Sequence, residues 1–287
     1  MLDGVCRNGF FLGAGNDYAA ARVVLIGAGL DTTGCFRPGA REGPRAIRYF
    51  SQCLEEYSLR LERDIREAGF YDLGDLDLPF GDVETALSRI QQAADRVLSD
   101  GKTPVFLGGE HLITLPVVTA VHSRFPDLVV LHFDAHADLR DQYLGVRLSH
   151  ATVIRRVAEL LGQRRVYQFG IRSADKEELR FAEENTRLHL YGAGEPLAAV
   201  YDELLVRPVY VTLDIDVVDP AYAPGVGTPE PGGIGPAELI EAVYRFQGLN
   251  LVGFDVVEVN PVYDPGGLAP LLAAKVIREI VLILSGK

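Results

Sequence analysis

The sequence predicts an α/β domain in which helices cover both faces of a parallel sheet. Short apolar runs alternate with longer amphipathic segments along its 287 residues, the order of repeated strand–helix units. The apolar runs are nearly continuous in Val, Leu, Ile and Phe, as in strands buried on both sides. No linker, low-complexity segment or internal repeat interrupts the alternation, so we expect one domain over residues 1–287. A TIM barrel of this length is the structural alternative.

The expected helices are amphipathic, and the expected strands between them are short. Segment 43–58 is interpreted as a helix with Pro44 tolerated in its first turn. Segment 82–100 has apolar residues at helical spacing: Ala86, Ile90, Ala93, Ala94 and Val97. Further helices are expected at 111–124, 150–161, 174–185, 235–246 and after Pro270. The strands are expected at 21–30, 69–76, 103–109, 127–136, 164–172, 207–216 and 249–259.

Composition restricts the classes of partner. The formal net charge of −12 argues against nucleic acid, whose binding needs clustered Lys and Arg, and is compatible with a cationic ligand. The three cysteines, Cys6, Cys35 and Cys53, are widely spaced and odd in number, which indicates reduced thiols. No stretch approaches the roughly 20 apolar residues of a membrane span, and residues 1–10 lack a secretory signal pattern. We therefore expect a cytoplasmic protein.

Polar residues interrupt the apolar runs where four predicted strands end. Ligands of parallel α/β folds bind beyond the carboxyl ends of the strands, so these residues should converge on one edge of the sheet. The stretch VVLHFDAHADLR, at 129–140, ends a strand with two aspartates and a histidine at alternate positions. The complete set is His111 after Gly108 and Gly109; Asp134, His136 and Asp138; Asp214 and Asp216, followed by Asp219; and Glu258.

Taken singly, some of these residues have simpler explanations. His111 alone could begin a helix, Asp219 before Pro220 suits a turn, and Glu258 alone could be a surface carboxylate. Four aspartates sharing one strand edge would repel one another and would be costly to bury, so the cluster predicts bound divalent cations. Carboxylates with imidazole and no thiolate favour Mn²⁺ or Mg²⁺ over Zn²⁺ or Fe²⁺, and the histidines favour Mn²⁺. Six ligand residues suit two ions about 3.5–4 Å apart.

Four segments resemble, in order and spacing, the signatures of the ureohydrolase family, which includes arginase and agmatinase. They are GGEHLIT, HFDAHADLR, TLDIDVVDP and DVVEVNP, and the resemblance extends to FRPGAREGPRAIR near the family's active-site mouth. It implies a three-layer α/β/α sandwich with a central, mainly parallel sheet, and a homo-oligomer, either a trimer or a hexamer. It also implies two Mn²⁺ ions per subunit, held by His111, Asp134, His136, Asp138, Asp214 and Asp216.

The resemblance further implies roles in hydrolysis. A hydroxide that bridges the two metals would attack the guanidinium carbon of the substrate. Glu258 would bind the guanidinium, and Asp138 would pass a proton to the leaving amine. His150, in RLSHATVIRR, matches the family's proton shuttle and would also contact substrate, while Ser149 is the more natural helix cap.

The other histidines are expected to be structural. His132 is interpreted as a packed residue behind the ligands, and His122 and His189 as surface or packing residues.

Several departures from the family pattern bear on specificity. Many relatives have GGDHS where this chain has Glu110 and Leu112, and Ala151 replaces a common glycine; we expect neither departure to abolish activity. Arginases have an asparagine that helps to hold the substrate carboxylate at the position where this chain has Arg140. This departure from the arginase pattern resembles bacterial agmatinases. We therefore expect hydrolysis of agmatine to putrescine and urea.

Three alternatives stay open. An inward-pointing Arg140 would favour a guanidino acid such as guanidinobutyrate, and an arginase belongs to the same class of alternatives. The chain could also be a non-catalytic family member that binds a polyamine. A metal-dependent deacetylase of the same ancestral fold ranks low, because such enzymes typically carry adjacent histidines and this sequence has none.

Overall fold

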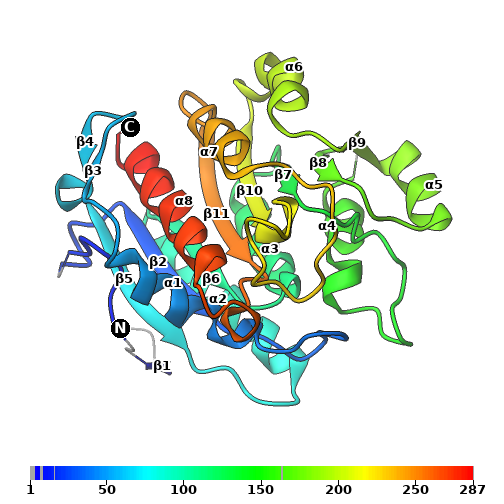
Figure 1. The fold of residues 1–287 in the computed structure, drawn as a ribbon, viewed down its shortest axis with the longest axis horizontal. Coiled ribbons are helices and arrows are strands. Elements are labelled where there is room, and N and C mark those ends of the chain that lie inside the picture. The colour runs from blue at the N-terminus through cyan, green and yellow to red at the C-terminus, as the bar shows by residue number, and fades with distance from the viewer. Residues whose placement is uncertain (1–3, 7–8, 16, 163, 287) are drawn as a thin grey trace.

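A computed structural model describes residues 4–6, 9–15, 17–162 and 164–286. In this part of the chain nine strands form one open sheet in the order β1-β5-β2-β6-β11-β10-β7-β8-β9 (Figure 1). All neighbouring strands are parallel except the edge pair β1–β5. The bounds are β1 Val5–Cys6, β2 Val23–Ala28, β5 Phe70–Leu76, β6 Thr103–Gly108, β7 Val129–Phe133, β8 Val166–Ile171, β9 Thr186–Leu190, β10 Pro208–Asp214 and β11 Asn250–Val257.

Helices cover both faces of this sheet and enclose two apolar cores. Side chains alternate between the faces of a strand, so in β10 Val211 enters one core while Tyr210 enters the other. The first core lies beneath α1 (Gly43–Ser51), α6 (Gly194–Leu204), α7 (Pro236–Tyr244) and α8 (Leu268–Ser285). The second lies beneath α2 (Val83–Ser99), α3 (Thr114–Arg124), α4 (Val153–Leu161) and α5 (Lys176–Asn185).

The predicted fold class is therefore confirmed, as a mainly parallel sheet between two helical layers. The TIM-barrel alternative is wrong, because the sheet has two edges, β1 and β9, and does not close. Five strands and α-helices of the described chain were not predicted from the sequence: the short strands β1, β3 (Tyr57–Ser58) and β4 (Arg63–Asp64), the edge strand β9 and the helix α6. β9, whose sequence is TRLHL, lies at a sheet edge and is only partly buried, so it lacks the continuous apolar run that marks the central strands.

Some predicted bounds are wrong. The first helix ends at Ser51 rather than at residue 58, and residues 57–58 instead form β3 (Tyr57–Ser58), paired with β4 (Arg63–Asp64). The strand predicted to reach residue 136 ends at Phe133. The strand predicted to reach residue 216 ends at Asp214, and a 3₁₀ turn follows over Ile215–Val217.

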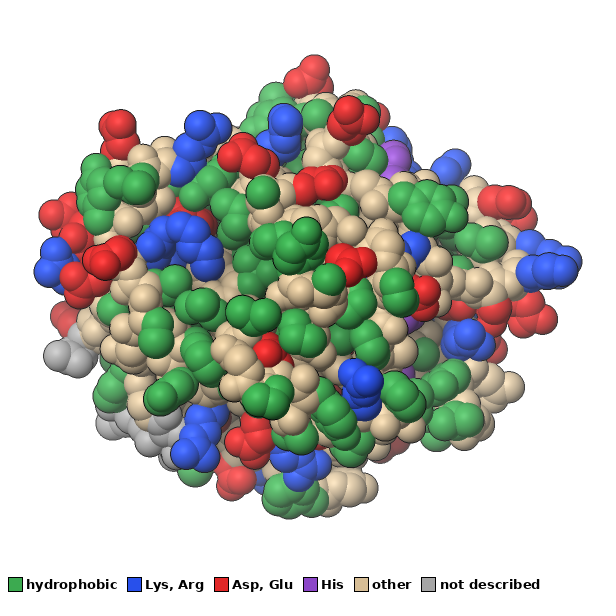
Figure 2. Space-filling model, viewed as in Figure 1, with side chains coloured by type: hydrophobic (Ala, Val, Ile, Leu, Met, Phe, Trp, Pro, Cys, Tyr) green, Lys and Arg blue, Asp and Glu red, His purple; other side chains and the backbone are tan. Residues whose placement is uncertain are grey.

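The surface view shows one helical face. On this face Lys and Arg side chains are interspersed with Asp and Glu side chains (Figure 2). All three cysteines are free, in agreement with the predicted reduced thiols, and all three are exposed. Among the described helices, none combines the length and apolar character that crossing a bilayer would require.

Strand order decides where the site forms. β6, β11, β10 and β7 are consecutive and parallel, so their carboxyl ends meet at one edge of the sheet. In register, Asp214 pairs with Val257, Leu213 with Phe133, and Val256 with Leu107. The residues that follow these four strands are those singled out by sequence.

Candidate metal centre and active site

The predicted metal ligands and Glu258 lie at the four strand ends or shortly after them, and Asp214 is itself the last residue of β10. His111 opens a 3₁₀ turn, His111–Ile113, shortly after β6, and Glu258 directly follows β11. Asp134 begins the loop after β7, and this loop also carries His136 and Asp138. The sequence suggested that the alternate spacing of these three residues reflects a strand. The structure instead places all three in a loop. Asp138 and Glu258 have positive φ angles of 53° and 62°, a backbone strain that clusters at functional sites.

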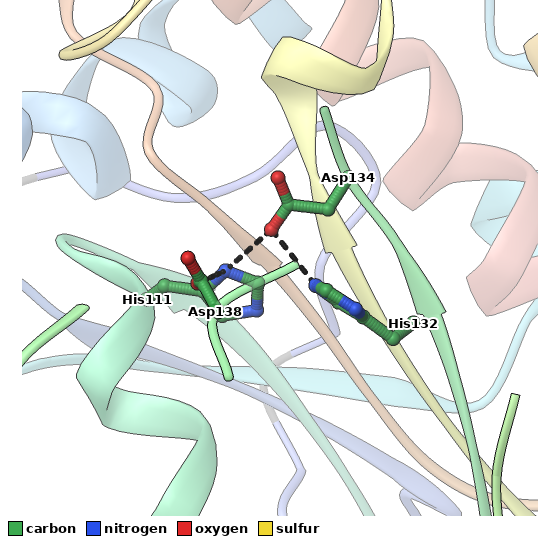
Figure 3. A group of neighbouring side chains, drawn as sticks. All are labelled: His111, His132, Asp134 and Asp138. Atoms are coloured by element: carbon green, nitrogen blue, oxygen red, sulfur yellow. Dashed lines mark hydrogen bonds and ion pairs between the residues drawn. The ribbon is translucent and has the colours of Figure 1, made fainter. Parts of the chain in front are cut away.

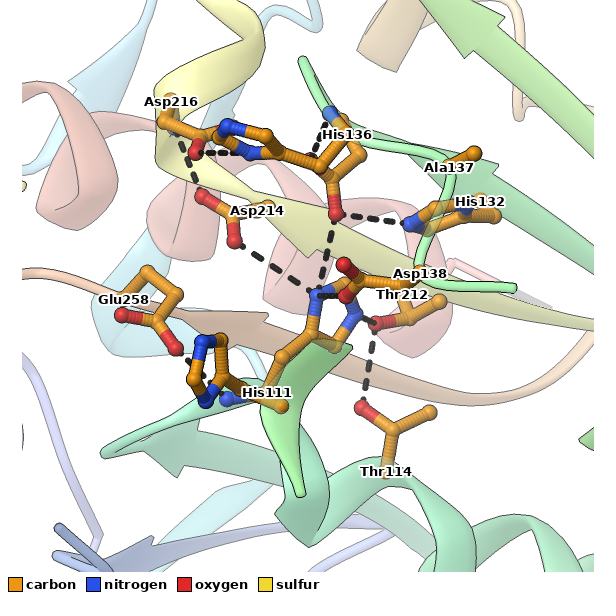
Figure 4. A network of polar contacts seen from close by, with 12 residues as sticks. His111, Thr114, His132, His136, Ala137, Asp138, Thr212, Asp214, Asp216 and Glu258 are labelled. Carbon is orange, nitrogen blue, oxygen red and sulfur yellow. Dashed lines mark hydrogen bonds and ion pairs between the residues drawn. The ribbon is translucent and has the colours of Figure 1, made fainter. Parts of the chain in front are cut away.

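Three aspartates are held at one oxygen by a backbone amide. Asp134 Oδ1 accepts the amide of His136 at 2.6 Å, and Asp214 Oδ1 accepts that of Asp216 at 2.8 Å. Asp216 Oδ1 accepts the amide of Ala135 at 3.0 Å. The second oxygen of each carboxylate therefore points at a histidine of the cluster, as Figure 4 shows for Asp214 and Asp216.

The two predicted histidine ligands define two halves of the cluster. His111 Nδ1 lies 3.0 Å from Asp134 Oδ2, 3.3 Å from Asp138 Oδ2 and 3.5 Å from Asp214 Oδ2. His136 Nδ1 lies 3.0 Å from Asp216 Oδ2 and 3.4 Å from Asp134 Oδ1. Asp134 therefore contacts both halves, one through each oxygen, and Figure 3 shows it between His111 and His132.

Burial makes this cluster electrostatically costly. Burial, with Asp216 and Asp134 nearby, raises the pKa of Asp214 well above its usual range. Burial and the charge of Asp134 raise the pKa of Asp138 to about 7, and burial raises the pKa of Glu258 to about 8. Burial alone would lower the pKa of His136, but Asp216 and Asp134 outweigh it and raise the pKa to about 12. The site thus favours added positive charge.

The hydrogen bonds behind His111 leave its Nδ1 available for a cation. Thr212 donates its hydroxyl proton to Asp255 Oδ1 at 2.6 Å, so Thr212 Oγ1 can only accept at His111 Nε2, 2.9 Å away. In the neutral imidazole the proton therefore sits on Nε2, and Nδ1 presents a lone pair to the aspartates. This buried Nδ1 has no hydrogen-bond partner in the described part of the chain.

The distances fit a divalent ion. Ligand atoms at right angles around an octahedral ion, with bonds of about 2.1 Å, lie about 3.0 Å apart, close to the 3.0–3.5 Å separations around His111 Nδ1. In a protein without metal, a proton on Nδ1 provides the same compensation. Asp134, Asp138 and Asp214 accordingly outweigh the effect of burial and raise the pKa of His111 well above its usual range.

His132 orients Asp134, one of the predicted ligands, and is packed behind it, as expected from the sequence. Gln168 donates its amide to His132 Nδ1 at 3.1 Å, and Thr186 fixes the amide by donating to Gln168 Oε1 at 2.9 Å. His132 Nε2 therefore carries a proton and donates to Asp134 Oδ2 at 2.8 Å. Although His132 lies near enough to be counted among possible ligands, this donor role directs it to Asp134 instead.

A cavity of about 300 Å³ opens above the cluster. Its lining includes all predicted metal ligands except Asp134, together with Glu258 and His150. Glu258 Oε1 accepts the backbone N–H of His111 at 2.8 Å, which fixes this carboxylate beside the cluster. His150 is largely buried on the cavity wall, and burial, followed by the nearby His111 and His136, lowers its pKa to about 4. Ser149 takes the N-cap position of the turn His150–Thr152, as expected.

Arg140 lines the same cavity but is already paired. Its guanidinium lies 2.9 Å from Asp175 Oδ2 and 3.7 Å from Glu178 Oε2, and it lies over the Tyr143 ring. Glu230 lies elsewhere on the lining. The cavity wall therefore contributes more acidic than basic groups.

Sequence reasoning missed Thr212 and Asp255, which determine the proton position on His111. A signal was present, because Asp255 is a carboxylate within an otherwise apolar strand and is fully buried. A buried carboxylate needs hydrogen-bond donors. Asp255 accepts hydrogen bonds from the hydroxyl groups of Tyr210, Thr212 and Thr114. His189 behaves as a packing residue, stacked on Phe169 at 5.2 Å.

The fold and the buried His/Asp cluster define an α/β protein with a candidate metal centre, and comparison with known proteins gives its family. The sequence matches the Arginase family over residues 21–283. An agmatinase from Bacillus subtilis (strain 168) is 46% identical over 275 residues, covering 95% of both chains. A guanidinobutyrase from Pseudomonas aeruginosa is 36% identical, covering 93% of this chain and 88% of its own.

Comparison with solved structures agrees with the family match. The solved agmatine ureohydrolase of Thermoplasma volcanium has a TM-score of 0.86 at 36% identity, covering 96% of this chain and 93% of its own. The chain belongs to the arginase family. It is an enzyme, a hydrolase that acts on amidines.

Proposed function

We propose that this protein is a manganese-dependent hydrolase that cleaves agmatine to putrescine and urea. The convergence of six ligand-type side chains beneath one cavity carries the proposal. The proposed ligands of two Mn²⁺ ions are His111, Asp134, His136, Asp138, Asp214 and Asp216. When bound, two such ions would lower the pKa of a bridging water and supply hydroxide near neutral pH.

The proposed roles of the protein groups follow from their positions. Glu258 binds the guanidinium through charge-assisted hydrogen bonds and orients its carbon toward the cluster. Asp138 holds the proton for the leaving amine, a role supported by burial on the cavity wall. His150 exchanges protons between the cavity and solvent as a neutral imidazole, and contacts substrate from the wall.

The substrate is proposed from the charge of the cavity wall. Agmatine is a dication, and Glu230, Asp175 and Glu178 supply negative charge around Arg140, the one arginine on the described cavity lining. Because Arg140 is already paired, a substrate carboxylate would have to compete with Asp175 for it. The agmatinase of B. subtilis at 46% identity supports the same choice.

A guanidino acid such as guanidinobutyrate is the second candidate. It is favoured by the presence of Arg140 on the cavity lining and by the guanidinobutyrase relative at 36% identity.

The experiment is urea release by Mn²⁺-loaded protein from agmatine, arginine and guanidinobutyrate in parallel. We expect the highest kcat/KM with agmatine. A preference for arginine would contradict the assignment, and binding of agmatine without urea release would indicate a non-catalytic polyamine-binding protein. We further propose a single-domain, cytoplasmic homo-oligomer, trimeric or hexameric, which light scattering after size exclusion would test for its assembly.

A further inference from the structure

Glu110, where the chain departs from the common family motif, is a buried acceptor of four donors. Its side chain is 1% exposed. Oε2 accepts the backbone N–H groups of Thr32 and Thr33, both at 2.7 Å. Oε1 accepts the Thr33 hydroxyl at 2.9 Å and, more weakly, the Thr32 hydroxyl at 3.4 Å. All four groups donate to the two side-chain oxygens, so both oxygens must accept, as the oxygens of an ionised carboxylate do.

The contact with Glu110 determines what Thr33 can do on its other side. A threonine hydroxyl has one proton and two lone pairs. The proton of Thr33 goes to Glu110, which leaves Oγ1 as an acceptor. Two groups of His150 reach that oxygen, the backbone N–H at 3.0 Å and the ring Nδ1 at 3.1 Å. Thr33 is then fully satisfied only if His150 Nδ1 carries a proton.

This proton count selects one tautomer of His150. Burial lowers the pKa of His150, so the ring is neutral near pH 7 and carries a single proton. With that proton on Nδ1, the lone pair lies on Nε2, which has no partner in the described part of the chain. The His150 ring lines the cavity above the His/Asp cluster, whereas Thr33 does not line this cavity. The group available to accept a proton on the cavity side is therefore Nε2.

We propose that Glu110 is a positioning residue that acts through Thr33 to hold His150 as the tautomer with an unprotonated Nε2. The inference rests on the proposed function for the use of that nitrogen in hydrolysis. The tautomer itself does not depend on any substrate.

Substitution of Glu110 by glutamine should reverse the tautomer without removing the side chain. The two backbone N–H groups at Oε2 require an acceptor there, so the glutamine oxygen must take that place. Its NH₂ group then occupies the Oε1 position and donates to Thr33. The Thr33 hydroxyl can now donate only to His150 Nδ1, and the ring proton moves to Nε2.

The direct test is ¹⁵N NMR of the imidazole nitrogens at neutral pH in protein loaded with diamagnetic Mg²⁺. The chain has six histidines, and a His150→Asn sample identifies the His150 signals. We expect a protonated Nδ1 and an unprotonated Nε2 in the wild type, and the reverse in Glu110→Gln. A protonated Nε2 in the wild type, or an unchanged tautomer in folded Glu110→Gln, would overturn the inference.

Matched variants distinguish the effect of the hydrogen-bond relay, from Glu110 through Thr33 to His150, from an effect of altered packing. Thr33→Ser keeps the hydroxyl and should retain the wild-type signals, whereas Thr33→Val removes the acceptor and should give a mixture of tautomers. Thr32→Val removes only the 3.4 Å contact and should leave the signals unchanged. If Glu110→Gln does not fold, Thr33→Val decides the question, because a single unchanged tautomer in that variant would contradict the relay.

Kinetics provide the second readout. General acid–base groups contribute about 10²–10⁴-fold, so we expect kcat with agmatine to fall by at least about 10²-fold in Glu110→Gln while KM changes less than about twofold. Thr33→Ser, which keeps the hydroxyl, should retain most of the wild-type kcat. Wild-type protein that releases no urea would refute the proposed function while the NMR result still decides the relay. Urea release by the wild type with an equal kcat in Glu110→Gln would leave the proposed function standing and would refute the role of this His150 tautomer in hydrolysis.

Discussion

Two histidines of the site share one arrangement of partners. A carboxylate takes the hydroxyl proton of a threonine, and the threonine oxygen then accepts from the imidazole. Asp255 and Thr212 act in this way on His111, and Glu110 and Thr33 on His150. In each case the imidazole proton is held away from the cavity side, which leaves a lone pair where a metal ion or a proton can bind.

At Thr212, replacement by valine should weaken metal binding without removing a proposed ligand. His111 Nε2 would lose its acceptor, and the tautomer with Nδ1 free would no longer be favoured. Partners of ligand histidines typically contribute about 10–100-fold in metal affinity. We expect Mn²⁺ in the His111 half of the cluster to bind 10–100-fold more weakly, measured by titration calorimetry and metal analysis.

Thr114→Val is the control for Thr212→Val. Thr114 also donates to Asp255, at 3.0 Å, but it does not contact His111 in this network. Its loss should leave Mn²⁺ affinity unchanged. Equal Mn²⁺ affinity in Thr212→Val and wild type would contradict the tautomer argument for His111.

The residues of the His/Asp cluster could be predicted from sequence, but their hydrogen-bond partners could not. Repulsion among aspartates at one sheet edge and the motif spacing both indicate Asp134, His136 and Asp214 from the sequence alone. The partners Thr212 and Thr33 are ordinary residues in sequence, and only their hydrogen-bond neighbours give them a role. The pairing of Arg140 with Asp175 also depends on loop geometry, which strand and helix patterns do not specify.

Among the elements, helix α1 is tied to strand β5 by a buried ion pair. Arg48 of α1, 2% exposed, contacts both oxygens of Asp72 at 2.8 and 2.9 Å and also pairs with Asp75. Truncating Arg48 to alanine leaves Asp72 as an uncompensated buried charge. Breaking a buried pair in this way costs about 3–5 kcal/mol of unfolding free energy, which urea denaturation would measure.

The exposed pair Arg66–Asp64 provides the comparison. The Arg66 side chain is 62% exposed, and solvent screens the interaction. Arg66→Ala should therefore leave stability unchanged within error. Similar losses in Arg48→Ala and Arg66→Ala would show that burial of the α1–β5 pair does not matter.

Elements with strong periodicity were predicted well, and their ends less well. The β6, β7, β10 and β11 strands were anticipated because they are central, apolar and continuous. The β9 strand was missed because an edge position tolerates polar residues. The overextension of β7 to residue 136 had a specific cause, since alternate polar residues in a loop imitate the two-residue period of a strand.

At the scale of the whole molecule, the site concentrates protons when no metal is bound. Asp138, Glu258 and His136 have raised pKa values, of about 7, 8 and 12. Between about pH 6.5 and 8 the folded protein retains protons that the unfolded chain has released at these groups, so stability falls as pH rises. The lowered pKa of His150 acts in the opposite sense, but only below about pH 6.5.

We therefore expect the Tm of the protein in EDTA to fall as pH is raised from 6.5 to 8.5. A shift of at least about 3 °C corresponds to a loss of about 1 kcal/mol in a chain of this size. Mn²⁺ should restore Tm, and by more at the higher pH, because protons compete with the metal for the same groups. A Tm in EDTA that stayed constant or rose over this range would contradict the assigned pKa directions.

The measurement that tests the metal centre most directly is anomalous X-ray scattering from crystals of Mn²⁺-loaded protein. The account predicts two manganese peaks about 3.5–4 Å apart, one beside His111 Nδ1 and one beside His136 Nδ1, with Asp134 between them. A cluster without manganese, or manganese bound only elsewhere on the protein, would contradict it.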